Sequence, residues 1–161
     1  MNTAKKAPRR QERVLAFKVL YSLCFTPVTS IEDLRETFEG SPDKVDSLDG
    51  NPISFAWELV RGVWIEQSTV DEAITGFSQN WRIERMAKVE LTLLRLALFE
   101  LMFRPDIPAR AVVNEAIELS KQFGDDKSRG FVNGILDAAL KAIDSGELVR
   151  TTETAKTKAS I

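Results

Sequence analysis

Few residues of this 161-residue chain have the types and spacing that catalysis requires. The chain contains no histidine, so it lacks the commonest general base and the commonest zinc ligand. The single cysteine, Cys24, falls on the apolar stripe of the first expected helix and is interpreted as a packing thiol. The pairs Asp125–Asp126 and Glu115–Glu118 lack neighbours that would make one carboxyl an acid and the other a base. With no glycine-rich phosphate loop and no Cys-x-x-Cys motif, the sequence predicts no catalytic site, no metal site and no cofactor.

Arginines near the N-terminus are better suited to binding than to catalysis. Arg9 and Arg13 are four positions apart, so they share one face of a helix that starts near Pro8, and Arg10 adjoins them. Guanidinium groups at this spacing can hold successive phosphates of a nucleic-acid backbone in bidentate contacts.

The charge distribution points to the same end of the chain. Residues 1–18 carry a net charge of +5 and the remainder carries −7, although the whole chain is nearly balanced at −2. We therefore expect a flexible basic arm over residues 1–8, with Lys5 and Lys6, attached to an acidic body. A polyanion such as nucleic acid would then meet a local patch, whereas a merely solvated terminus is the alternative.

A second group of candidate binding residues lies in segment 124–131, which we interpret as a loop between the last two helices. It contributes two cations, Lys127 and Arg129, and the ring of Phe131. Phe131 falls at the margin of the following apolar stripe. It is therefore either a marginal core residue or a ring available for stacking on a base.

The hydrophobic pattern is helical almost throughout, and no segment shows the sustained alternation of a strand. We predict an all-α fold with a single domain over residues 9–144 and a disordered polar tail over residues 145–161. Ser30 is expected to cap a short helix, and Asn51 followed by Pro52 is expected to cap the next. The expected helices cover residues 9–25, 31–38, 52–76 with a break near 68–69, 86–103, 108–124 and 132–143.

Charge inside the expected central helix needs partners. Arg95 and Glu100 lie on a helix that is apolar nearly all round, so at least one of them should form an ion pair. Glu90, at the start of that helix, is free either to stay solvated beside the helix dipole or to contact a basic partner.

Several ordered motifs resemble one known family. These are Arg9-Arg10-x-x-Arg13 leading into Ala16-x-x-Val19-Leu20-Tyr21, Leu59-Val60-x-Gly62-Val63, Leu94-Arg95-Leu96-Ala97-Leu98-Phe99-Glu100-Leu101 followed by Arg104-Pro105-Asp106-Ile107-Pro108, Asn114-Glu115-Ala116-Ile117-Glu118-Leu119, and Phe131-Val132-Asn133-Gly134-Ile135-Leu136-Asp137. Over about residues 9–143 the chain is similar to the NusB family of transcription antitermination factors.

This resemblance implies about seven helices in two small packed bundles and a non-enzymatic role. It implies that the protein joins the ribosomal protein NusE, that the pair binds single-stranded boxA RNA of nascent ribosomal RNA transcripts, and that the assembly acts on RNA polymerase with other Nus factors. It also implies roles for individual residues. The RNA contacts would be Lys5, Lys6, Arg9, Arg10, Arg13, Tyr21, Lys127, Arg129 and Phe131, and the protein partner would contact Glu90.

Two other interpretations of the same sequence stay open. A helical protein–protein adaptor would need no direct contact with RNA. NusB-like bundles also precede ribosomal RNA methyltransferase domains, but here a polar tail ending at Ile161 follows the bundle. We expect a cytoplasmic protein with no leader and no membrane segment, and the sequence leaves open whether it is a monomer or a homodimer.

Overall fold

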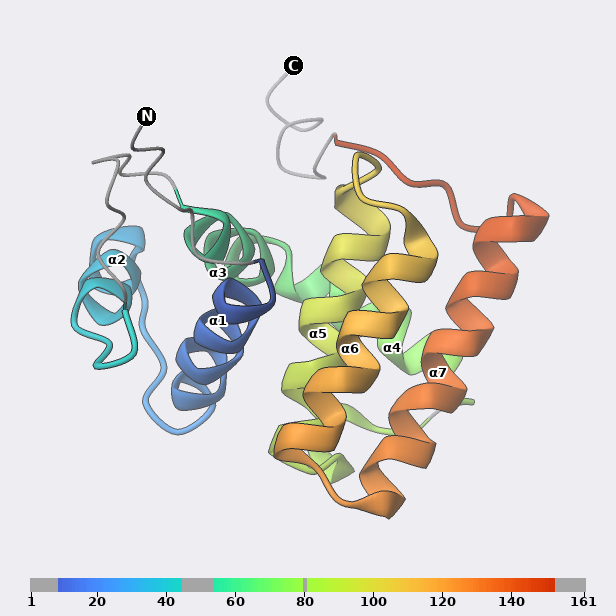
Figure 1. Ribbon diagram of the computed structural model, residues 1–161, viewed down its shortest axis with the longest axis horizontal. Helices are drawn as coiled ribbons and strands as arrows, with labels where there is room; N and C mark the ends of the chain where they lie inside the picture. Colours follow the sequence, from blue (N-terminus) through green and yellow to red (C-terminus); the bar gives the residue numbers. More distant parts are fainter. Residues whose placement is uncertain (1–8, 45–53, 80, 153–161) are drawn as a thin grey trace, which may run out of the picture. The chain divides into compact units, whose positions relative to one another are not determined.

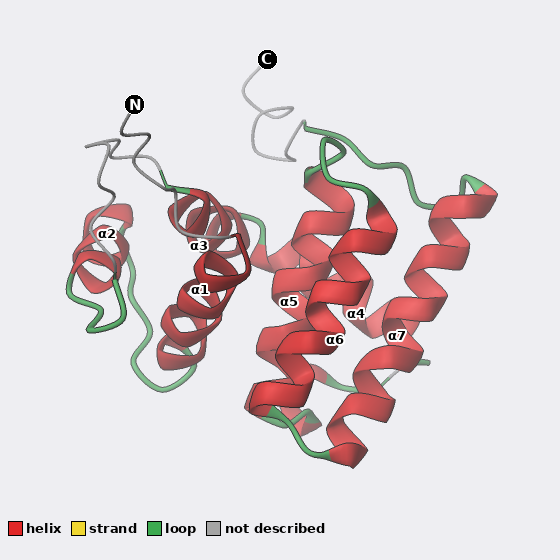
Figure 2. Cartoon of the chain, viewed as in Figure 1, coloured by secondary structure: helices red, strands yellow, loops and turns green. Residues whose placement is uncertain are grey.

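A computed structural model of the chain describes residues 9–44, 54–79 and 81–152. Within these ranges it contains seven α-helices, one short 3₁₀ helix and no strand (Figures 1 and 2). The all-helical class predicted from the sequence is therefore confirmed. The chain divides into two compact units, residues 1–62 and residues 63–161, and the division falls within α3. The prediction of a single domain over residues 9–144 stays a prediction.

The first unit contains α1 (Arg9–Leu23), α2 (Ile31–Glu39) and most of α3 (Phe55–Ile65). Ser30 caps α2 as expected, because its hydroxyl oxygen accepts a hydrogen bond from the Asp33 amide at 3.1 Å. The start of α3 differs from the expectation. Ser54 Oγ accepts a bond from the Trp57 amide at 3.0 Å, while the expected cap at Asn51 and Pro52 lies outside the described residues.

The second unit contains α4 (Gln67–Phe77), the 3₁₀ helix η1 (Ile83–Arg85), α5 (Lys88–Phe103), α6 (Ala109–Phe123) and α7 (Asp126–Ser145). Helices α5, α6 and α7 lie side by side (Figure 1). Almost every residue of α5 from Leu91 to Phe103 is buried, which its all-round apolar sequence predicts. The break expected near residues 68–69 occurs at Glu66, between α3 and α4.

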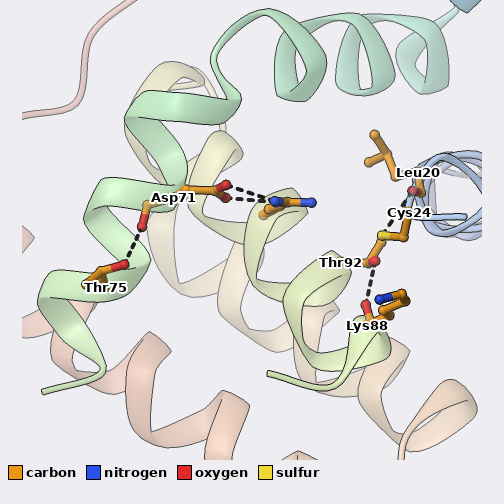
Figure 3. Close-up of polar contacts among 7 residues, drawn as sticks. Leu20, Cys24, Asp71, Thr75, Lys88 and Thr92 are labelled. Atoms are coloured by element: carbon orange, nitrogen blue, oxygen red, sulfur yellow. Dashed lines mark hydrogen bonds and ion pairs between the residues drawn. The ribbon is translucent and has the colours of Figure 1, made fainter. Parts of the chain in front are cut away.

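The charges of α5 find partners inside the second unit. Arg95 donates from Nε and Nη2 to the two carboxylate oxygens of Asp71 on α4, each at 2.8 Å (Figure 3). This bidentate pair is half-buried and confirms the expected ion pair. It fixes α4 against α5 in one register.

The end of the described chain is ordered where the sequence predicts a disordered tail. Gly146 ends α7 in the left-handed region at φ 82°. Arg150 then donates to the carbonyl oxygens of Leu101 and Arg104 at 2.7 Å each and of Glu100 at 3.2 Å. These carbonyls lie at the C-terminal end of α5, where the last turn leaves acceptor capacity that the helix does not fill, although the Glu100 carbonyl also accepts from the Arg104 amide at 3.0 Å. The prediction of disorder from residue 145 is therefore wrong up to residue 152.

Candidate nucleic-acid interface

The cationic start of α1 is built around an aromatic ring of α3. The guanidinium carbon of Arg9 lies 4.4 Å from the centroid of the Phe55 ring, and that of Arg13 lies 5.1 Å from it. The expected shared face of Arg9 and Arg13 is therefore present, but it is turned toward Phe55. Arg9 and Arg10 are exposed, whereas Arg13 is only 5% exposed. The prediction that Arg13 contacts RNA stays a prediction, and a phosphate that reached this guanidinium would have to displace its packing.

Glu12 holds the same end of α1 against α3. Burial raises the pKa of its carboxyl above the ordinary value of 4.5, and the backbone amides of Ala56 and Phe55, together with the charge of Arg9, partly oppose that rise. The carboxylate thus sits at the start of α3, where it complements the positive end of the helix dipole. The sequence shows Glu12 only as an acidic residue in a basic segment, so this positioning role was missed.

Further along α1, Tyr21 belongs to a ladder of rings. Its ring stacks on that of Phe17 at 5.9 Å between centroids and meets that of Phe25 edge-on at 5.1 Å. Tyr21 is half-buried, and Phe25 is 59% exposed. Lys18 pairs with Asp43 at 3.3 Å, so it is already engaged. Lys5 and Lys6 lie outside the described residues.

In the second unit, the predicted loop 124–131 is mostly helix. Asp125 caps α7, because its carboxylate accepts a bond from the Ser128 amide at 2.8 Å. This hydrogen bonding holds the pKa of Asp125 below its ordinary value. Lys127 and Arg129 therefore lie on the first turn of α7. Lys127 is exposed, while Arg129 forms an ion pair with Asp126.

Glu90 is half-buried and forms a hydrogen bond within the second unit. Its Oε1 accepts a hydrogen bond from Ser128 Oγ at 3.0 Å, and its side chain is half-buried. The contact joins the first turn of α5 to the first turn of α7. Glu90 therefore helps to position the residues of α7, a role that the sequence did not suggest, and its predicted contact with a protein partner stays a prediction.

Phe131 has a neighbour that sequence reasoning missed. Its ring is half-buried and meets the ring of Trp81 edge-on, with 5.7 Å between centroids. Trp81 is 54% exposed. The signal was visible in the sequence, because Trp81 is a large aromatic residue within the polar run Gln79-Asn80-Trp81-Arg82.

The described residues include no group of three or more His, Cys, Asp and Glu side chains that could hold a metal ion. None of the helices in the described ranges combines the length and apolar character needed to cross a bilayer. Cys24 is a half-buried thiol whose Sγ donates to the Leu20 carbonyl at 3.8 Å (Figure 3). This contact agrees with its interpretation as a packing residue.

The helical fold, the exposed cations at the starts of α1 and α7, and the exposed rings of Phe25 and Trp81 are the features of a small helical nucleic-acid-binding protein. Residues 10–141 match the model of the NusB family, and the chain belongs to that family. The transcription antitermination protein NusB of Nitratidesulfovibrio vulgaris (strain DSM 19637 / Miyazaki F) is 55% identical over 158 residues, which cover 91% of this chain and 96% of the relative. The NusB protein of Myxococcus xanthus (strain DK1622) is 39% identical over 136 residues, which cover 84% of this chain and 96% of the relative.

Solved structures show the same fold. The structure of T. maritima NusB superposes with a TM-score of 0.74 at 30% identity and covers 98% of this chain and 100% of its own. A second similar structure is a complex of the antitermination factors NusB and NusE with dsRNA. Its matching chain has a TM-score of 0.70 at 29% identity, and the match covers 83% of this chain and 96% of that chain.

Proposed function

We propose that this protein is a transcription antitermination factor that binds boxA RNA together with the ribosomal protein NusE. The assembly acts on RNA polymerase with other Nus factors, in the cytoplasm, to suppress premature termination in ribosomal RNA transcription. The protein itself catalyses no reaction. Its relatives named as antitermination proteins and the NusB–NusE–RNA complex support this proposal.

The observation that carries the proposal is the exposed cationic start of α1. Arg9 and Arg10 are exposed there, whereas residues 19–161 carry a net charge of −7. An acidic body repels RNA, so a polynucleotide that binds this protein is directed to the local cations. In the second unit, Lys127 supplies a further exposed cation at the start of α7.

Base contacts then decide which RNA is preferred, because phosphate contacts carry no sequence information. Unpaired bases can be splayed out and recognised by rings and polar groups, which favours a single-stranded element over a duplex. Tyr21 and Phe131 are the candidate ring contacts named by the sequence, and both are half-buried.

The test is a fluorescence-anisotropy titration of labelled boxA-like RNA with the protein alone and with purified NusE. Scrambled single-stranded RNA and duplex RNA serve as competitors. We expect the two proteins together to bind boxA RNA more tightly than either alone and to prefer it to both competitors. Binding to NusE without RNA binding under any condition would make the protein an adaptor and overturn the proposal. Light scattering on the same samples decides between a monomer and a homodimer.

A further inference from the structure

Trp81 presents an exposed ring four residues after the end of α4. Its amide donates to the Ser78 carbonyl at 3.4 Å, and the single proton of the Ser78 hydroxyl is shared between the Thr75 carbonyl at 3.1 Å and the Trp81 carbonyl at 3.3 Å. Ser78, to which Trp81 is hydrogen-bonded, is itself buried. Gln79, within the turn, has φ 55°, a left-handed conformation that costs free energy for a residue other than glycine. Trp81, although joined to a buried residue, is therefore left 54% exposed.

Phe131 supports this ring from α7. The two rings meet at 64° with 5.7 Å between centroids, the edge-to-face geometry that aromatic pairs prefer. One such contact occupies at most one face or edge of the indole, which leaves area for another planar group. Because Phe131 is half-buried and Trp81 is more exposed, the ring that a ligand would meet first is that of Trp81.

The charges around the pair favour a nucleotide over an apolar protein surface. Lys127 precedes Phe131 by four residues, so it shares that face of α7, and it is exposed. Arg82 follows Trp81 directly and is also exposed. Asp125 caps α7 and Asp126 pairs with Arg129, so both are engaged, whereas Glu84, three residues after Trp81, is an exposed carboxylate. An aromatic ring with cations beside it is the arrangement that binds single-stranded nucleic acid, whereas the core of a protein interface is depleted of charge.

We propose that Trp81, supported by Phe131, stacks on one unpaired base of the bound RNA, while Lys127 and Arg82 contact the adjoining phosphates. The inference rests on the proposed function and adds to it a binding residue in the second unit. It also changes the role of Phe131, which becomes the support of the stacking ring instead of the ring that meets the base.

The test compares wild type with Trp81→Leu and Trp81→Phe, each with NusE, on boxA-like RNA and on a series in which one base at a time is removed to leave an abasic sugar. We expect Trp81→Leu to weaken binding of intact RNA about thirtyfold, the middle of the range for one base–aromatic stack, and Trp81→Phe to retain most of the affinity. At one abasic position the leucine variant and wild type should bind equally, because the stacked base is already absent. Arg10→Ala is the matched control, since it should weaken binding to intact and abasic RNA alike.

Tryptophan fluorescence provides a second readout. Trp57 is buried and Trp64 is half-buried, so RNA should quench mainly Trp81, and Trp81→Leu should abolish that quenching. Equal affinity of wild type and Trp81→Leu for intact RNA would overturn the inference and leave the proposed function standing. Loss of NusE binding with RNA binding retained would assign Trp81 to a protein contact and also overturn it. If wild type with NusE binds no RNA, the proposed function fails first.

Discussion

Arg10 and Arg13 provide a sharp test of which cations RNA can reach. Arg10 is exposed, whereas Arg13 is 5% exposed and lies over the Phe55 ring. For single-stranded RNA, each phosphate contact adds about −0.7 to the slope of log affinity against log salt concentration. Arg10→Ala should therefore flatten the slope by about 0.7. Between about 50 and 200 mM salt, the ratio of the RNA affinity of wild type to that of Arg10→Ala should then fall about 2.6-fold.

Arg13→Ala should act on stability instead. A desolvated cation–π contact contributes about 2 kcal/mol, and that loss should lower the melting temperature by about 4–8 °C in a chain of this size. The salt slope should stay at the wild-type value, because a buried guanidinium releases no counterions from RNA.

The assay is RNA binding by fluorescence anisotropy at several salt concentrations, with thermal unfolding followed by circular dichroism. Arg61→Ala, which removes an exposed arginine of α3, controls for the change in net charge. The reasoning is refuted if Arg13→Ala flattens the salt slope as much as Arg10→Ala and leaves the melting temperature unchanged. That result would mean that Arg13 leaves Phe55 to meet a phosphate.

Two further predictions concern the contacts that hold the fold. Arg150→Ala removes three hydrogen bonds to the end of α5; at about 0.5–1.5 kcal/mol each, reduced for partial exposure, the loss should be about 2 kcal/mol in urea unfolding. Arg110→Ala, which breaks only an exposed pair with Asp144, should cost less than about 1 kcal/mol, and equal losses would disprove the role of Arg150. Burial raises the pKa of Glu12 above its ordinary value of 4.5. The protonated carboxyl therefore adds stability that is fully present below pH 4.5 and is lost as the pH rises through the raised pKa. Wild type should therefore gain stability relative to Glu12→Gln on moving from pH 7 to pH 4, and a pH-independent difference in melting temperature would contradict the assignment.

The sequence predicted the helices well where the signal was local. The apolar surface of α5 and the cap at Ser30 follow from residues within a few positions of each other. The start of α7 was also a local signal, but it was misjudged. Asp125 and Asp126 were interpreted as a capping cluster within a loop, and Asp125 does cap a helix, but that helix starts at Asp126 and not after Phe131. That error placed Lys127 and Phe131 in a loop.

Long-range contacts account for what the sequence could not predict. The polar composition after residue 145 indicates disorder, and only the structure shows Arg150 bound to carbonyls 46 to 50 residues earlier. The partners of Glu90 and Arg95 were hidden for the same reason. The sequence shows that a buried charge needs a partner, but periodicity does not say which residue supplies it.

The candidate site illustrates the same limit in functional terms. A sequence locates cations, but RNA responds only to those that remain exposed, and exposure depends on which ring packs against which side chain. Phe55 on α3 holds Arg13 out of solvent, while Phe131 on α7 supports Trp81 without covering it. Both rings lie more than a helix away in sequence from the residue that they position. Charge patterning can therefore locate the cationic end of such a chain. Aromatic packing between helices decides which side chains there remain exposed and can be reached by RNA.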